Sequence, residues 1–187
     1  MSAPHAALAA SPWVLRWSAL LAPAARVLDV ACGSGRHVRH LALLGHRVTA
    51  VDRDALALDP LRSLADVVVA DLEAGTWPFS TQRFDAVVVT NYLWRPLLAR
   101  LVESVAPGGL LIYETFALGH QSVGKPSNPD FLLRPGELLD AVRGELRVLG
   151  YEDGFVDTPA RFVQRIAAVR EAPGVATAPT SPPRYLL

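Results

Sequence analysis

The hydrophobic residues of this chain fall into short, nearly continuous runs, and amphipathic stretches with helical spacing separate most of these runs. Continuous apolar runs are typical of parallel strands that helices cover on both faces, whereas strands with one wet face alternate. The order of runs and amphipathic stretches therefore predicts an α/β domain. The expected strands are 26–31, 47–52, 66–70, 84–90, 110–115, 146–153 and 161–170, and the turn-rich segment 154–159 joins the last two.

Capping residues and prolines set the expected helix boundaries. Ser11 followed by Pro12 predicts the start of a short helix, which Pro23 ends. Further helices are expected at 34–44, at 54–64 (divided or kinked by Pro60), from Pro96 to the Pro107-Gly108-Gly109 turn, and at 135–142. The residues expected on buried helix faces are Val38, Leu41, Ala42 and Leu44 in the second helix, and Leu97, Leu98, Leu101, Val102 and Val105 in the fourth.

The most informative unit joins the first two strands. The apolar run 27–31 leads into a glycine turn with Gly33 and Gly35, a helix follows, and the second run ends at Asp52. Glycines let a backbone approach a ligand closely, and a carboxylate that ends the second strand can accept both ribose hydroxyls. A dinucleotide fingerprint would need a small third residue where Val38 stands. The unit therefore predicts a nucleoside-like cofactor other than a dinucleotide, although a purely structural turn is the alternative.

This unit resembles motif I of the class I S-adenosylmethionine-dependent methyltransferases, D/E-x-G-x-G-x-G, with Asp29 as the acid and Ala31 in place of the first glycine. An alanine fits there if its φ is negative. The resemblance covers residues 11–170. It implies a single-domain Rossmann-like fold, with a seven-stranded, mostly parallel sheet, an antiparallel last strand and helices on both faces. It also implies that S-adenosylmethionine is the cofactor and S-adenosylhomocysteine the product.

The same resemblance assigns roles to individual residues. Asp29 and the turn 31–35 would face the methionine half, Asp52 the ribose, and Asp71 with Leu72 the adenine. The full set of expected cofactor-binding residues is Asp29, Ala31, Cys32, Gly33, Gly35, His37, Asp52, Arg53, Asp71, Leu72 and Asn91.

Composition narrows the classes of partner. The 187 residues suit one domain, and 18 basic residues balance 18 acidic ones, which makes a nucleic-acid partner unlikely. There is no apolar run long enough to span a membrane, and Cys32 is the only cysteine, which favours a cytoplasmic protein. We expect residues 1–10 to be flexible and the Pro/Ala/Thr-rich residues 171–187 to be disordered.

The sequence gives less information about the part of the site that would bind the methyl acceptor than about the cofactor part. The strand 84–90 is followed by Asn91 and Tyr92, without the N/D-P-P-Y/F motif of adenine-N6 methylases, so that specificity is not carried over. The segment 117–134 is long, aperiodic and glycine-punctuated, which predicts a lid or binding loop. It resembles the region after strand five in small bacterial methyltransferases of the tellurite-resistance-like group.

From that loop and the strand ends we expect a substrate cage. Its candidate residues are Tyr92, Trp94, Glu114, His120, Lys125, Asn128 and Arg134, and the weak catalytic candidates among them are Tyr92, Glu114 and His120. No metal site is expected, since His37 and His40 form only a helical pair. The expected function is methyl transfer to a small molecule. The alternatives are an RNA, DNA or protein methyltransferase and a non-catalytic module that binds the cofactor or its product.

Overall fold

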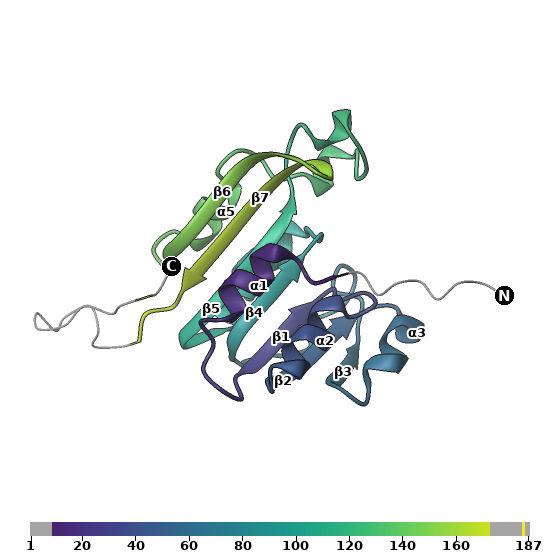
Figure 1. Ribbon diagram of the computed structural model, residues 1–187, viewed down its shortest axis with the longest axis vertical. Helices are drawn as coiled ribbons and strands as arrows, with labels where there is room; N and C mark the ends of the chain where they lie inside the picture. The colour runs from purple at the N-terminus through teal and green to yellow at the C-terminus, as the bar shows by residue number, and fades with distance from the viewer. Residues whose placement is uncertain (1–8, 173–184, 186–187) are drawn as a thin grey trace, which may run out of the picture.

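A computed structural model describes residues 9–172 and Tyr185, and these residues form one seven-stranded sheet (Figure 1). The strand order is β3-β2-β1-β4-β5-β7-β6, with β7 antiparallel between β5 and β6. The predicted mostly parallel sheet with an antiparallel last strand is therefore confirmed. The strands are β1 (Arg26–Val30), β2 (Arg47–Asp52), β3 (Asp66–Val69), β4 (Phe84–Thr90), β5 (Val105–Phe116), β6 (Arg147–Asp157) and β7 (Ala160–Val169).

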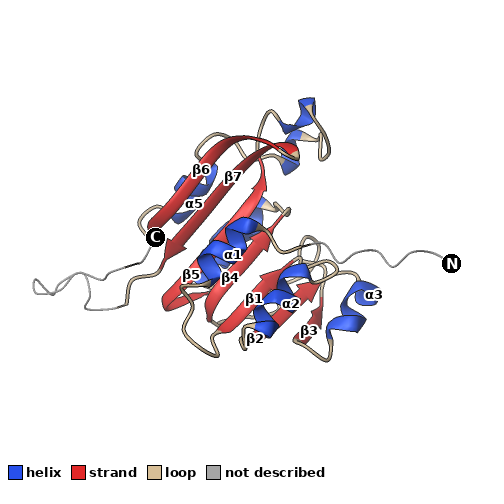
Figure 2. Ribbon diagram, in the orientation of Figure 1, coloured by secondary structure: helices blue, strands red, loops and turns tan. Residues whose placement is uncertain are grey.

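Helices cover both faces of this sheet, as Figure 2 shows. One face packs against α1 (Pro12–Ser18), α2 (Arg36–Leu43), α3 (Ala55–Leu58) and the 3₁₀ turn η1 (Asp59–Leu61). The other face packs against the 3₁₀ turn η2 (Arg95–Leu97), α4 (Leu98–Glu103) and α5 (Glu137–Val142). Neighbouring residues of one strand serve the two cores in turn: Val27 belongs to the first and Leu28 to the second, and neither is exposed.

Local signals placed several helix ends correctly. The Ser11 side chain accepts a hydrogen bond from the Trp13 N–H and caps α1, and Pro60 divides the expected 54–64 helix into α3 and η1. The predicted burial of Leu44 was wrong, because α2 ends at Leu43 and Leu44 is 49% exposed. None of the described helices is both long and apolar enough to cross a membrane.

Two strand boundaries were wrong because pairing extends past the turn residues. The Pro107-Gly108-Gly109 turn lies inside β5: the Gly108 N–H donates to the Arg170 carbonyl (2.7 Å), and the Arg170 N–H to the Gly109 carbonyl (2.9 Å). Val105 therefore belongs to β5 and not to the preceding helix. Likewise β6 continues through the expected turn to Asp157, because Phe155 pairs with Phe162 across the hairpin.

Of the chain ends 1–10 and 171–187, residues 1–8, 173–184 and 186–187 lie outside the part that the structure describes, and nothing tests the expected flexibility and disorder. They stay predictions.

Candidate functional site

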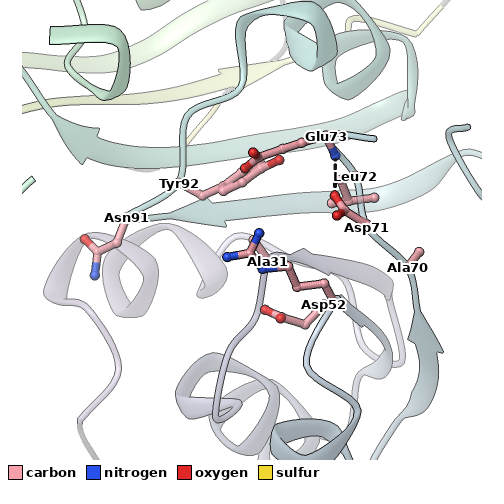
Figure 3. Close-up of a pocket in the computed structure, with 9 residues that line it drawn as sticks. Ala31, Asp52, Ala70, Asp71, Leu72, Glu73, Asn91 and Tyr92 are labelled. Carbon is pink, nitrogen blue, oxygen red and sulfur yellow. Dashed lines mark hydrogen bonds between the residues drawn. The ribbon is translucent and has the colours of Figure 1, made fainter. Parts of the chain in front are cut away.

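A cavity of about 240 Å³ opens at the carboxyl ends of β1 to β4 (Figure 3). The carboxyl ends of parallel strands meet at one edge of a sheet, so residues distant in sequence converge there. Figure 3 shows the side chains of Glu73 and Tyr92 on one side of this cavity and Asp52 on the opposite side. The residues that line it are Ala31, Asp52, Arg53, Ala70, Asp71, Leu72, Glu73, Asn91 and Tyr92.

The glycine turn forms one wall beside this cavity. The Gly33 N–H donates to Oδ2 of Asp52 (2.8 Å), which ties the turn to the end of β2. Gly33 has a φ of 54°, and a Cβ at this position would meet no atom within 4 Å, so the space above it is open. Gly35 has a φ of 77°, and a Cβ there would lie 2.4 Å from Cδ1 of Leu61. Gly33 thus leaves room for a ligand, whereas Gly35 allows η1 to pack against the turn.

Ala31 lies in the same turn in a conformation that the sequence did not lead us to expect. Its φ is +50°, in the left-handed region, and the expected negative φ was therefore wrong. The left-handed conformation costs an alanine roughly 1–2 kcal/mol. This strain sits on the cavity wall, where a glycine would relieve it.

Asp52 and Asp71 both line the cavity with their carboxylates partly engaged by the backbone. Oδ1 of Asp52 accepts from the Asp54 N–H (3.0 Å). Oδ1 of Asp71 accepts from the N–H groups of Glu73 (2.9 Å) and Ala74 (3.2 Å), and these hydrogen bonds hold the pKa of Asp71 below its usual value. Each carboxylate keeps lone pairs free for hydroxyl or amino groups of a ligand.

Three of the expected cofactor-binding side chains do not line the cavity: those of Asp29, Cys32 and His37 are buried in the interior. Asp29 is 1% exposed, and neither of its oxygens has a partner among the described residues. Burial raises its pKa to about 7, partly opposed by the positive charge of Arg36. Burial also raises the pKa of the Cys32 thiol, so this cysteine is a packing residue and not a thiolate.

His37 connects three segments of the fold. Its Nε2 accepts from the Ser11 backbone N–H (3.1 Å), so the ring proton lies on Nδ1, which is 3.4 Å from Oγ1 of Thr90. Burial and the positive charge of Arg36 lower its pKa to about 3. A neutral His37 therefore joins α1, α2 and the end of β4, and it holds the edge on which the cavity lies.

The expected cage around Glu114 does not form. Glu114 is 1% exposed, and it accepts from Oγ of Ser11 (3.0 Å). It also forms ion pairs with Arg165 (2.8 Å) and Arg161 (3.6 Å). The prediction was wrong because β5 turns this carboxylate toward α1 and β7, where cationic side chains neutralise it. Glu114 is thus a buried ion-pair partner and not part of an open substrate site.

His120 is likewise structural. Its ring stacks on Phe116 (4.3 Å between centroids), and its Nε2 lies 3.0 Å from the Lys125 carbonyl oxygen. The Asn128 side chain accepts from the Asp130 N–H, which caps a 3₁₀ turn, η4 (Pro129–Phe131). Four further candidate side chains line neither the cavity described above nor a second cavity at the same edge of the sheet: Trp94, Lys125, Asn128 and Arg134.

The second of these cavities, of about 260 Å³, shares Glu73, Asn91 and Tyr92 with the first. The loop 117–134 contributes Pro126 and Phe131 to this cavity, and none of the residues that we expected from it. The remaining lining residues are Leu93, Thr115, Phe116, Pro126 and Phe131. Sequence reasoning missed these and Glu73. The one available signal was their position near strand ends at the ligand-binding edge: Phe116 is the last residue of β5, and Glu73 follows the end of β3 at Val69.

Comparison with known sequences gives one family match, which covers less than half of the chain. Residues 27–109 match the sequence family described as a methyltransferase domain. No curated protein matches the chain. The similar solved structures have low sequence identity to this chain, so the likeness establishes the fold alone.

Among similar solved structures is a TehB-like SAM-dependent methyltransferase from Corynebacterium glutamicum, with a TM-score of 0.63, 21% identity, and coverage of 85% of this chain and 87% of that one. TehB from Haemophilus influenzae has a TM-score of 0.67 at 22% identity, over 84% of this chain and 61% of that one. A coclaurine N-methyltransferase bound to N-methylheliamine and SAH has a TM-score of 0.58 at 19% identity, over 76% of this chain and 49% of that one.

Proposed function

We propose that this chain, whose residues 27–109 form a methyltransferase domain within the class I S-adenosylmethionine-dependent fold, transfers a methyl group to a small-molecule acceptor. The observation that carries the proposal is the pair of adjoining cavities at the carboxyl edge of the sheet. One is bounded by Ala31 of the glycine turn and by three carboxylates, and the other shares Glu73, Asn91 and Tyr92 with it. A transferase of this kind needs a compartment for each reactant.

The first cavity suits the cofactor. S-adenosylmethionine supplies, when bound, a methyl group activated by a sulfonium. Asp52 would accept the ribose hydroxyls, and Asp71 the adenine amino group beside the Leu72 side chain. The open space above Gly33 fits a ligand that approaches the backbone closely. Ala31, Arg53 and Asn91 also line this cavity and complete the proposed cofactor set.

The role of the protein is to align the two reactants and to keep water away, because displacement at a sulfonium needs no acid catalyst. Tyr92 lines both cavities, and its backbone is fixed from β5, since the Tyr113 hydroxyl donates to the Tyr92 carbonyl (2.8 Å). Asn91 is fixed by a hydrogen bond from its N–H to the Glu114 carbonyl (2.9 Å). The Glu114 backbone thus supports this wall, whereas its buried side chain lines neither cavity.

The alternatives fit the observations less well. A methyltransferase for RNA or DNA would need a basic groove beside 92–95 and 119–134, but Arg95 is held by Glu137 and by the carbonyls of Asp130 and Leu132. A non-catalytic binding module would need no compartment next to the cofactor, whereas the second cavity provides one.

The test is to incubate the purified protein with S-adenosylmethionine carrying a labelled methyl group and an extract of small and large molecules. We expect label in the small-molecule fraction. Label mainly in nucleic acid or protein would replace the proposed acceptor class, and the absence of transfer despite cofactor binding would favour the non-catalytic alternative. Asp52→Asn is the control that should reduce transfer to every fraction.

A further inference from the structure

The second cavity has a distinctive chemical lining. Three aromatic rings contribute to it, Tyr92, Phe116 and Phe131, together with the apolar side chains of Leu93 and Pro126. Glu73 supplies the only charge among the described residues that line it, and none of them is Lys, Arg or His. Aromatic faces carry negative potential, so rings combined with a carboxylate attract an organic cation. An anionic acceptor would find no counter-charge here.

The position of Tyr92 adds a polar group to this lining. Its hydroxyl is shielded from solvent and has no hydrogen-bond partner among the described residues. Burial and the nearby charges of Glu73 and Asp71 raise its pKa, so it stays a neutral phenol. Figure 3 shows the Tyr92 ring and the Glu73 side chain next to each other above the first cavity. A phenol oxygen and a carboxylate are therefore available at the junction of the two cavities.

The size of the cavity limits the ligand. A dry apolar cavity of about 150 Å³ holds a benzene ring. A cavity of about 260 Å³ admits one ring with a short side arm, and the exposed Phe131 leaves a path to solvent.

We propose that this cavity binds the acceptor as a small apolar or aromatic amine, which enters as an ammonium and is recognised by Glu73 and the rings of Tyr92, Phe116 and Phe131. This inference rests on the proposed function and names its substrate class. Glu73 is a specificity-determining residue in this scheme, because it selects the charge of the acceptor.

The chemical step balances with these groups. The ammonium first gives one proton to the Glu73 carboxylate, which is exposed and returns it to solvent. The nitrogen lone pair then attacks the methyl carbon, so that an N–C bond forms while the C–S bond breaks. The bonding pair goes to sulfur, which becomes a neutral thioether, and the positive charge ends on the N-methylammonium product. No oxidant, reductant or further co-reactant is required.

The test uses three probes of one shape and different charge: benzylamine, benzyl alcohol and benzoate. Their dissociation constants are measured by calorimetry on the full chain saturated with S-adenosylhomocysteine. We expect benzylamine to bind about tenfold or more tightly than benzoate, with benzyl alcohol between them. Glu73→Gln should weaken the binding of benzylamine about fivefold, which is the effect of one exposed charge pair. It should weaken the binding of benzyl alcohol less than about twofold. Benzylamine should also be converted to N-methylbenzylamine when S-adenosylmethionine replaces the product.

A matched control is Asp130→Asn, which removes the same charge from the neighbouring loop but from a residue that does not line the cavity. It should leave all three dissociation constants unchanged. Benzoate binding as tightly as benzylamine, undetectable benzylamine binding, or an unchanged preference in Glu73→Gln would each overturn the inference. Failure of S-adenosylhomocysteine itself to bind would instead refute the proposed function, so the two failures are distinguishable.

Discussion

Substituting the two glycines of the turn separates ligand binding from folding. Gly33→Ala places a methyl group in open space beside Asp52, where we propose that the cofactor lies. Gly35→Ala places a methyl group 2.4 Å from Cδ1 of Leu61 and 2.5 Å from Cδ2 of the same residue. Both residues have positive φ, so both variants share the same backbone strain, and only their surroundings differ.

The expected magnitudes follow from these differences. An alanine in the left-handed region costs roughly 1–2 kcal/mol, of which about 0.4–1 kcal/mol is regained because the unfolded chain loses entropy. Gly33→Ala should therefore lower the free energy of unfolding by about 1 kcal/mol, or about 2–4 °C in melting temperature. At Gly35, the clash adds about 1–3 kcal/mol of overpacking, for a loss of about 2–4 kcal/mol, on the order of 10 °C.

The assays are thermal unfolding and calorimetric titration with S-adenosylhomocysteine. Gly33→Ala should bind at least about tenfold more weakly, equivalent to 1.4 kcal/mol, while it unfolds near the wild-type temperature. Gly45→Ala is the control, since Gly45 also has a positive φ and open surroundings but lies at the end of α2. Wild-type affinity in Gly33→Ala would refute the turn as the cofactor cradle, and wild-type stability in Gly35→Ala would refute the packing argument.

Three other substitutions test the remaining assignments. Asp52→Asn should weaken S-adenosylhomocysteine binding about tenfold or more in calorimetry, and Asp71→Asn less than about threefold; the reverse order would exchange their roles. Glu114→Ala should lower the free energy of denaturant unfolding by about 3 kcal/mol, because it removes the buried partner of Arg165 and leaves that cation only the exposed Glu152, yet keep ligand affinity within about threefold. The wild type should lose stability relative to Asp29→Asn as the pH rises from about 4 to 7, by up to about 1.4 kcal/mol per pH unit. The native state retains the Asp29 proton over this range because burial raises its pKa to about 7, and parallel stability curves for the two proteins would contradict this.

The residues at the carboxyl ends of the parallel strands were predictable from the sequence. Asp52, Asp71 and Asn91 each follow an apolar run, and parallel strands bring such positions to one edge whatever the details of packing. The seven-stranded topology followed from the same runs together with the family resemblance.

Glu114 shows why the acceptor half was not predictable. It also lies near a strand end, but its partners, Ser11 and Arg165, are 103 and 51 residues away in the chain, so their approach is a property of the folded sheet. Conversely, Phe116 and Phe131 have the composition of core residues. Only the path of the loop 117–134 brings Phe131 to the cavity that Phe116, at the end of β5, also lines.

The central claim, that the carboxyl edge of the sheet binds S-adenosylmethionine, is tested most directly by thermal unfolding with S-adenosylhomocysteine and with NAD. A ligand that binds only the folded state adds about 2.7 kcal/mol at a hundredfold excess over its dissociation constant. For a domain of this size, the melting temperature should rise by roughly 5–10 °C with S-adenosylhomocysteine and stay unchanged with NAD. A rise with NAD and none with S-adenosylhomocysteine would contradict the account.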